Sequence, residues 1–342
     1  MRTKLSETIC ICLLAAFVFY GLSSCHKNKN ENPQPRVSVP VPTDKWTHLN
    51  TANWNVSAVE VVNNTIYAGS GNTLYISKDE GATWKSVKVA APGAADITAI
   101  KVFNNCIYIG SAGGNGIFSS NDGGVNWENS NASLFENSVS SFAELNNKLY
   151  AASDGDGVFV LNQSSNKWES FSYNLPRPFT SYHVFKITRI DNTLVAAAGV
   201  NSTFYRYSFD ARQWIESSLP KHGTYILDMV VDNGAIIGIG TEGKILRSEN
   251  LGMDWIYDAL DLLSSISMVI SNEKLYTGSL NYYVLINTVN GGWTQQRDKA
   301  APVGSSWAIK NDFLSKILLN GIAELNGKLF LATDHGFYIR KL

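Results

Sequence analysis

The sequence predicts an all-β fold, a seven-bladed β-propeller with four short strands in each blade. Two independent series of residues recur at similar intervals and predict it. The first is a series of tryptophans, spaced by 38, 43, 41, 46, 41 and 38 residues: Trp46, Trp84, Trp127, Trp168, Trp214, Trp255 and Trp293. The second is a series of tight-turn pairs: Asn63-Asn64, Asn104-Asn105, Asn146-Asn147, Asp191-Asn192, Asn233-Gly234, Asn272-Glu273 and Asn326-Gly327. A period near 40 residues is typical of a four-stranded blade.

Each unit contains the same elements in the same order. An apolar run precedes the turn pair, and we predict the first strand there: AVEVV, TAIKVF, SSFAEL, KITRI, LDMVV, ISMVI and NGIAEL. A run that ends in small residues follows the pair, as the second strand of a two-residue hairpin: TIYAGS, CIYIGS, KLYAAS, TLVAAAG, AIIGIG, KLYTGS and KLFLAT. The third strands are TLYIS, GIFSS, GVFVL, FYRYS, KILRS, YVLIN and GFYIR. The tryptophan of the unit then opens the fourth strand.

The two ends of the chain are predicted to share one blade. The last unit lacks a fourth strand, whereas Trp46 precedes the first complete unit. Residues 44–50 should therefore pair beside residues 336–342, which closes the ring and protects sheet edges that would otherwise recruit other chains. The propeller then occupies residues 44–342, about 43 residues per blade.

Composition excludes several classes of protein. The 342 residues are 44% hydrophobic and 17% charged, as in ordinary folded proteins, and 28 basic residues face 29 acidic ones. Without an excess of Lys and Arg to neutralise phosphates, nucleic-acid binding is not expected. The histidines of the body, His48, His183, His222 and His335, show no metal-ligand spacing. The Ser153–Gly157 loop could offer oxygens to Ca²⁺ but lacks the remaining ligands of any recognised calcium loop, which favours a turn between the second and third strands. We expect no metal, no cofactor and a monomer.

The N-terminal sequence predicts that the protein is located in the bacterial cell envelope. Residues 1–24 combine a cationic start with an apolar run from Ile9 to Leu22, which is too short to span a bilayer comfortably and favours a secretory signal. The run ends in Leu22-Ser23-Ser24-Cys25, which resembles a bacterial lipobox. That resemblance implies lipidation of Cys25 and membrane anchoring, most simply at the outer membrane, with its side left open. The alternatives are an uncleaved anchor and an ordinary signal with an incidental cysteine.

Residues 25–43 and the remaining cysteine complete this interpretation. The segment after Cys25 holds four prolines among mostly polar residues, which indicates an extended tether. With the signal removed and Cys25 lipidated, Cys106 is alone, so no intramolecular disulfide is possible. Its apolar surroundings favour a small buried hydrophobe over a nucleophile.

Three turns before a tryptophan share a tighter pattern. They consist of Ser77, Asp79, Gly81 and Trp84; Ser120, Asp122, Gly124 and Trp127; and Ser248, Asn250, Gly252 and Trp255. The pattern resembles the Asp-box, or bacterial neuraminidase repeat. That role is structural: the Asp carboxylate accepts backbone N–H groups, Gly supplies a positive φ, and Trp packs against the next sheet.

The Asp-box resemblance includes enzymes and non-enzymes. Sialidases carry an Arg triad and a Phe-Arg-Ile-Pro motif. Here the nearest candidate, Leu175-Pro176-Arg177-Pro178-Phe179, does not match, and eight Arg follow Cys25 without a clear triad pattern. These departures argue against sialidase activity. Photosystem-assembly-type factors, which bind protein, and secreted lipoproteins look closer.

A ligand site is predicted on the face with variable loops, because loops on a rigid scaffold commonly carry binding. Trp54 and Trp307 fall outside the fourth-strand series and are placed in loops of this face. The candidate aromatic platform, for a sugar or an extended peptide, consists of Trp54, Trp307, Tyr173, Phe179, Tyr182 and Tyr282, with Arg177 and His183 as polar contacts. The alternative is that both tryptophans fold inward and cap the axial channel.

The innermost strands carry charges of both signs: Glu60, Lys101, Glu144, Arg189, Asp228 and Glu324. This mixture predicts a wetted channel with internal ion pairs, structural more often than catalytic.

The sequence thus favours a membrane-anchored, non-catalytic binding or assembly protein for a glycan or a protein, and no catalytic residue is assigned. The alternatives are a sialidase-like glycoside hydrolase with an atypical active site, which needs two carboxylates facing one cleft, and a purely structural role.

Overall fold

The computed structural model describes residues 47–51, 53–89, 96–130, 138–172, 175, 184–198, 203–219, 225–241, 244–261, 265–271, 274–279, 283–288, 306–308 and 318–342. They belong to the second of two units of the chain, Val41–Leu342. The predicted signal peptide, Cys25 and the tether lie outside the described residues.

Within the described residues, the strands form seven antiparallel sheets of four strands each. Six of these sheets are each built from four consecutive strands. The first sheet consists of β2 (Val56–Val62), β3 (Thr65–Ser70), β4 (Thr73–Ser77) and β5 (Lys85–Lys88), and the second of β6 (Ile97–Phe103), β7 (Cys106–Ser111), β8 (Ile117–Ser120) and β9 (Glu128–Asn129). The third consists of β10 (Val139–Leu145), β11 (Lys148–Ser153), β12 (Gly157–Asn162) and β13 (Lys167–Ser170), and the fourth of β14 (Val184–Ile190), β15 (Thr193–Ala198), β16 (Thr203–Ser208) and β17 (Gln213–Ser218). Two more follow: β18 (Ile226–Asp232), β19 (Ala235–Gly240), β20 (Lys244–Ser248), β21 (Ile256–Asp261); β22 (Ser265–Ser271), β23 (Lys274–Ser279), β24 (Tyr283–Thr288), β25 (Ser306–Ala308).

The remaining sheet combines both ends of the chain. It has the order β1 (Thr47–His48), β28 (Gly336–Lys341), β27 (Lys328–Thr333) and β26 (Leu319–Leu325). Thr47 pairs with Ile339, and His48 pairs with Tyr338. The Phe337 N–H also donates to Thr51 Oγ1 at 2.8 Å, which extends the join beyond the two-residue strand.

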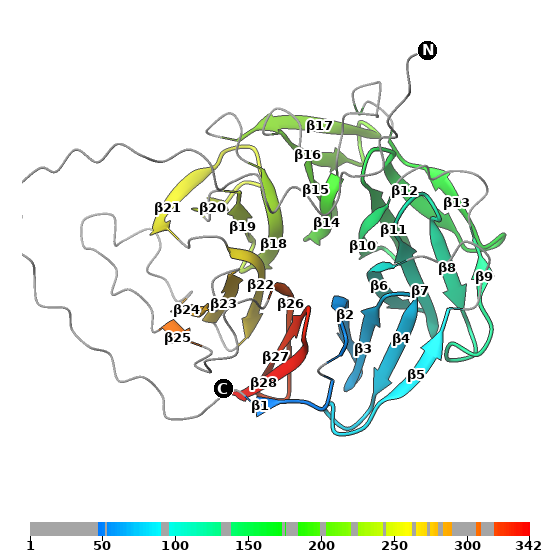
Figure 1. Cartoon of the computed structure of the whole chain (residues 1–342). Coiled ribbons are helices and arrows are strands. Elements are labelled where there is room, and N and C mark those ends of the chain that lie inside the picture. Colours follow the sequence, from blue (N-terminus) through cyan, green and yellow to red (C-terminus); the bar gives the residue numbers. More distant parts are fainter. Residues whose placement is uncertain are drawn as a thin grey trace, which may run out of the picture. The chain divides into compact units, whose positions relative to one another are not determined.

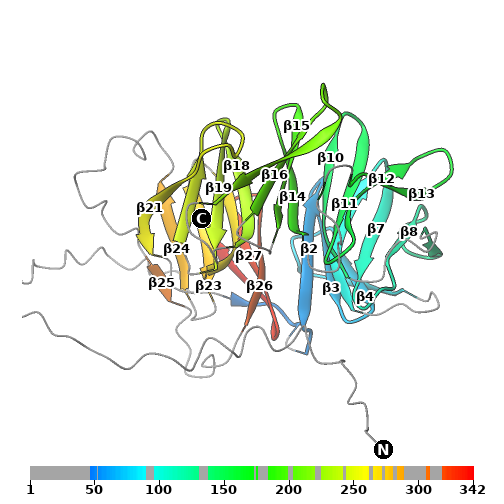
Figure 2. The same cartoon turned by 90° about the horizontal axis from the view of Figure 1, so that it is seen from above.

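The sheets stand around a common axis, and the first strand of each is innermost (Figures 1 and 2). The innermost strands are β2, β6, β10, β14, β18, β22 and β26. An all-β propeller of four-stranded antiparallel blades, the fold predicted from the repeats, is therefore confirmed.

Five of the six turn pairs among the described residues adopt the mirror-image conformation that a two-residue hairpin needs, whereas at Asp191-Asn192 only Asp191 has a positive φ. Asn63 and Asn64 have φ of 48° and 59°, and Asn104 and Asn105 have φ of 49° and 62°. A type I′ turn requires positive φ at both central residues, and Asn tolerates it better than most residues. The pair Asn272-Glu273 lies outside the described residues.

Each innermost strand contains a shift of register at its second residue: Ser57, Thr98, Ser140, Phe185, Leu227, Ile266 and Asn320. A bulge re-aims the side chain, and four of these side chains bind a carbonyl of the following sheet. Ser57 donates to Ile97 O at 2.6 Å and Thr98 to Val139 O at 2.6 Å. Ser140 donates to Val184 O. Asn320 donates to Val56 O at 2.8 Å, from the last sheet to the first.

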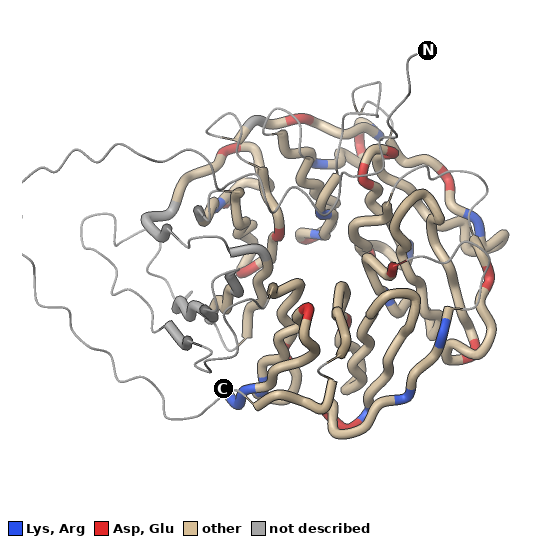
Figure 3. Tube along the Cα trace, in the orientation of Figure 1, with Lys and Arg blue, Asp and Glu red and all other residues tan. Residues whose placement is uncertain are grey.

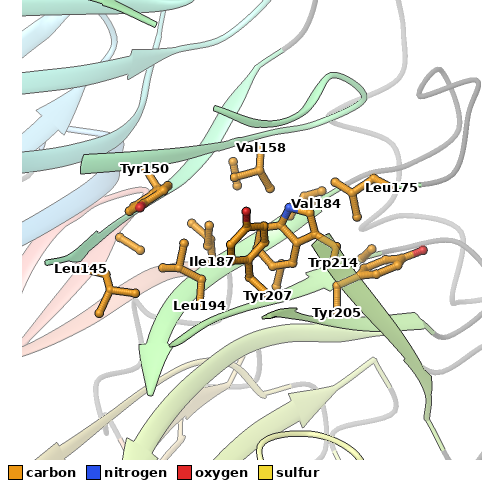
Figure 4. Close-up of a cluster of buried hydrophobic side chains, with 14 residues drawn as sticks. Leu145, Tyr150, Val158, Leu175, Val184, Ile187, Leu194, Tyr205, Tyr207 and Trp214 are labelled. Atoms are coloured by element: carbon orange, nitrogen blue, oxygen red, sulfur yellow. The ribbon is translucent and has the colours of Figure 1, made fainter. Parts of the chain in front are cut away.

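Apolar side chains fill the space between neighbouring sheets. Figure 4 shows the cluster between β10–β13 and β14–β17, where Tyr150, Val158, Leu194 and Trp214 meet. Burying one large apolar side chain stabilises a fold by about 1.5–3 kcal/mol, so these clusters hold the sheets side by side.

The tryptophans at or just before the fourth strands pack against the preceding sheet, and the prediction that they face the next sheet is wrong. Trp84 stacks on Phe337 with 5.3 Å between ring centroids. Trp255 meets Phe204 edge to face at 4.8 Å. Side chains alternate between the two faces of a strand, and the position at which Trp enters the fourth strand places its ring on the face toward the preceding sheet.

Candidate functional site

A cavity of about 300 Å³ lies on the axis. Its lining comes from all seven innermost strands and includes bulged residues such as Ser57, Thr98 and Asn320. These residues lie where the first strands begin, so the cavity belongs to the face on which the loops enter the innermost strands. This is the face where the sequence predicts a ligand.

Two ion pairs cross between neighbouring sheets in the cavity. Lys101 Nζ lies 2.8 Å from Glu60 Oε1, and Lys186 Nζ lies 2.7 Å from Asp228 Oδ1. The predicted internal pairing is confirmed for Glu60 and Lys101. Asp228 also pairs, but with Lys186, which is not among the predicted channel charges.

The other predicted channel charges behave differently. Glu144 and Arg189 are exposed. Glu324 accepts the Gly327 N–H of its own hairpin at 2.8 Å. Figure 3 shows charges of both signs interspersed along the described chain, in keeping with the balanced composition.

Asp228 joins three sheets. Its Oδ1 accepts the Met229 N–H at 2.9 Å, and its Oδ2 accepts the Met268 N–H at 3.0 Å and the Ser267 hydroxyl at 3.2 Å. The Asp228 side chain is 10% exposed to solvent. The negative charge of Asp228 raises the pKa of Lys186, although burial opposes the rise. Lys186 is therefore held as the ammonium ion.

One side of the cavity mouth is apolar. Phe185 and Leu227 are the bulged residues of β14 and β18, whereas four other innermost strands carry hydroxyl or amide groups at this position. The Phe185 ring meets Tyr225 edge to face, with 6.3 Å between centroids. The cavity thus combines an apolar lip with a polar interior, a combination that is not among the sequence-based predictions.

The predicted aromatic platform is only partly within the described residues. Trp54 stacks on Tyr75 with 3.6 Å between centroids and packs into the core between the last and first sheets. Its assignment to an open platform is therefore corrected, since its ring lies between sheets. Trp307 lies on β25, paired with Val284, and not in a loop. The other candidates lie outside the described residues: Tyr173, Arg177, Phe179, Tyr182, His183 and Tyr282.

The Ser-Asp turns, defined as residues 77–84, 120–127 and 248–255, join third to fourth strands. Ser77 donates to Asp79 Oδ1 at 2.8 Å and accepts the Gly81 N–H at 2.8 Å. Asp79 accepts the Thr83 N–H at 2.9 Å, and Trp84 Nε1 donates to Gly81 O at 3.0 Å. The Thr83 hydroxyl and N–H, together with Ser77, lower the pKa of Asp79.

The Ser-Asp turns lie on the face opposite to the cavity mouth. Glu80 in the first of them pairs with Lys328 and accepts from Asn326 at 2.7 Å. Asn326 lies in the hairpin turn of the last sheet, and Lys328 follows that turn. Their polar groups are thus committed to the turns and to neighbouring hairpins.

The described residues contain one cysteine, Cys106. Burial raises the pKa of the half-buried Cys106 thiol, which leaves it a poor nucleophile at neutral pH. No group of three or more His, Cys, Asp or Glu that could hold a metal ion occurs among the described residues. The described part of the chain also contains no helix of sufficient length and apolar character to cross a membrane.

Known proteins share this architecture at low sequence identity. A comparison with curated proteins gives no significant match. YCF48 bound to D1 peptide is 13% identical with a TM-score of 0.66, covering 90% of this chain and 99% of that chain. The extracellular domain of the putative one component system BT4673 from B. thetaiotaomicron is 16% identical with a TM-score of 0.66, covering 87% and 40%. The computationally designed Ika8 protein is 11% identical with a TM-score of 0.62, covering 87% and 100%.

These structures show the fold that the chain shares with them. The family comparison is more specific, because a model described as the DUF6242 beta propeller domain matches residues 46–265, more than half of the chain. The chain belongs to the DUF6242 beta propeller domain family.

Proposed function

We propose that this protein is a non-catalytic binding or assembly protein of the bacterial cell envelope, anchored through lipid on Cys25, which holds its ligand at the axial cavity. The observation that carries the proposal is the cavity itself, which is lined from all seven innermost strands of the described sheets. A concave site with a few convergent polar groups is the usual form of a ligand site.

The ring and its turns support a rigid platform. We propose that the seven sheets form one closed ring in which the sheet of β1 and β28 is the closing blade, and that the Ser-Asp turns are Asp-boxes. The hydrogen bond from Asn320 to Val56 O, between the last and first sheets, supports closure. A rigid scaffold keeps the cost of ordering low when a ligand binds.

The charges of the cavity favour binding over acid–base chemistry. Glu60 and Asp228 are the carboxylates among the described lining residues, and each lies against a lysine ammonium group. YCF48, which has a related fold, is bound to D1 peptide in its structure, so we include peptides beside saccharides as candidate ligands.

Thermal unfolding of the full chain tests this function. Panels of saccharides and of short peptides are added at concentrations well above a millimolar Kd. Mass spectrometry shows whether any compound has been cleaved. A ligand present at 100 times its Kd stabilises the folded state by about 2.7 kcal/mol. We expect at least one compound to raise the unfolding midpoint by several degrees and to be recovered unchanged. Cleavage of a bound saccharide, or no rise with any compound, would contradict the proposal.

Anchoring is tested separately. The Cys25→Ser variant of the full chain should leave the membrane fraction of the producing bacterium, whereas Cys106→Ser should remain in it. Equal membrane association of the two variants would contradict a lipid anchor.

A further inference from the structure

The innermost strands turn one edge toward the axis, and the register determines which backbone groups lie on that edge. The two residues that flank a two-residue hairpin turn form a hydrogen-bonded pair. Along an antiparallel pair of strands, opposing residues then alternate between hydrogen-bonded and non-hydrogen-bonded pairs. In β2, Val62 pairs with Thr65 beside the turn, so Ala58 and Glu60 also bond to β3. Val59 lies between them, and its N–H and C=O therefore point away from β3, toward the axis.

The equivalent residue of every innermost strand lies in the same position: Val59, Ile100, Phe142, Ile187, Met229, Met268 and Ile322. Hydrogen bonds from the N–H groups of three of these residues confirm that these groups point away from the second strand of their own sheet. Ser141 Oγ of β10 accepts the Ile187 N–H of β14 at 2.8 Å. Asp228 accepts the Met229 and Met268 N–H groups.

On the other four strands the same donor is open to the cavity. Among the described residues, no side chain or backbone acceptor meets the N–H of the residues Val59, Ile100, Phe142 and Ile322, all of which line the cavity. The positions that correspond to Ser141 are occupied by Ala58, Ala99 and Gly321 on three neighbouring strands. These residues have no side-chain acceptor. An amide arc, made of these four residues, therefore runs over β26, β2, β6 and β10.

The opposite side of the cavity differs. There Lys186 and Asp228 form the polar wall, and Phe185 and Leu227 form the apolar lip. Both lysines of the cavity already hold carboxylates at 2.7–2.8 Å, so the paired charges cancel. The arc offers donors and acceptors in equal number, because each of its residues turns both N–H and C=O inward.

We propose that the axial cavity binds a neutral saccharide unit, an inference that rests on the proposed binding function. Hydroxyl groups both donate and accept, which matches the paired N–H and C=O groups of the amide arc. The carbon face of a sugar ring packs on the Phe185 and Leu227 lip. A volume of about 300 Å³ holds a short saccharide end.

Two other ligand classes fit less well. An anion would have to compete with Glu60 and Asp228 for the lysines, against carboxylates that are already in place. An extended peptide binds a strand edge through several consecutive backbone groups. The lining ends at Glu60 on β2 and at Lys101 on β6, so each edge offers too few groups for strand addition.

The Ala99→Ser variant tests the arc directly. Ala99 on β6 occupies the position that corresponds to Ser141 on β10, the next innermost strand. The new hydroxyl would therefore accept the Phe142 N–H, as Ser141 accepts the Ile187 N–H, and would remove one donor from the cavity. We expect the variant to fold normally and to bind the best saccharide at least fivefold more weakly. The control Ala82→Ser adds the same hydroxyl in an exposed turn on the opposite face and should bind unchanged.

The Phe185→Ala variant tests the lip, with Phe209→Ala as its control because Phe209 is 40% exposed on the outer turn between β16 and β17. Binding by the full chain is measured by calorimetry for neutral mono- and disaccharides, for hexuronates and for tripeptides. We expect neutral saccharides to bind, and Phe185→Ala to lose about tenfold in affinity, about 1.4 kcal/mol.

Each outcome separates the two proposals. Binding of only hexuronates or only tripeptides would overturn the saccharide inference and leave the binding function standing. Saccharide binding that is unchanged in both Ala99→Ser and Phe185→Ala would overturn the axial site. Absence of binding by every compound would overturn both.

Discussion

At the scale of single residues, Asp228 is the side chain on which most of the cavity wall depends. It accepts two backbone N–H groups, one hydroxyl and one ammonium group from three sheets. It is also placed where the bulged residues of β14 and β18, Phe185 and Leu227, cannot donate to the following sheet as Ser57 does. Asp228 thus supplies the hydrogen bonds between neighbouring sheets at that side of the cavity.

Removing the carboxylate should therefore be costly. Asp228→Ala leaves the buried donors and Lys186 without their acceptor, and breaking such a pair costs about 3–5 kcal/mol. We expect a loss of about 3 kcal/mol in the free energy of unfolding in urea, since Lys186 keeps 34% exposure and water replaces part of the contact. Asp228→Asn, which keeps an acceptor oxygen, should lose less. Asp232→Ala at the end of the same strand should change stability by under about 0.5 kcal/mol.

The residues of the site were harder to predict than those of the turns. The Asn pairs report a local need for positive φ, which a sequence displays directly. The bulged residues also carry a signal, because each lies six residues before its turn pair, from Ser57 and Asn63 to Asn320 and Asn326. Lys186 and Asp228 each lie five residues before theirs. What no pattern reveals is that these two side chains meet between neighbouring sheets, since that depends on the spacing of the sheets.

At the scale of elements, the fourth strands show where the repeat fails as a guide. The spacing of the series predicts Trp293 in the fourth strand of its unit, but Trp293 lies outside the described residues. The described fourth strand is β25, whose Trp307 pairs with Val284. Spacing predicts strands well where connections are short, and it loses its value where a long connection separates the third strand from the fourth. Most of the predicted ligand residues fall instead between a fourth strand, β13, and the next first strand, β14, where the repeat gives no position for a side chain.

The Ser-Asp turns should make stability depend on pH. The Asn126 N–H, the Ser120 hydroxyl and the Asn126 amide lower the pKa of Asp122 to about 2. The unfolded value is about 3.9, so the charged form is favoured in the folded chain. Its contribution is present above about pH 4 and is lost as the pH falls through about 2.

The third turn suggests the variant that tests this dependence. Asn250 holds the place of the aspartate there, and its Oδ1 accepts the Asp254 N–H at 2.8 Å. We expect the double variant Asp79→Asn, Asp122→Asn to fold, and to lose less stability than the parent chain between pH 4 and pH 2. Urea midpoints across this range measure the effect. Asp210→Asn, in an exposed turn, should follow the parent curve, and parallel curves for all three proteins would refute the explanation.

At the scale of the whole molecule, the join between the ends is the simplest point at which to weaken the proposed closed ring. β1 contributes only two residues, and the join is completed by Thr51, which receives the Phe337 N–H. Gly336 makes this approach possible. Its φ is 89°, and a Cβ atom there would collide with the Thr51 carbonyl, lying 2.6 Å from its carbon. Any other residue must push the N-terminal segment away from β28.

Gly336→Ala should therefore open the join, and Gly327→Ala is its matched control. Gly327 has φ of 72° in the same sheet, but no atom lies within 4 Å of a Cβ built there. Gly327→Ala should lower the free energy of unfolding only by the cost of a left-handed backbone at a residue with a Cβ atom, about 1–2 kcal/mol. Gly336→Ala adds a clash with backbone and should lower the free energy of unfolding by several kcal/mol more. An opened join also exposes the edge of β28, which invites pairing with other chains. We expect Gly336→Ala to show a lower urea midpoint and concentration-dependent growth in light scattering, and Gly327→Ala to remain monodisperse. Equal behaviour of the two variants would mean that the contact between the ends does not hold the ring together.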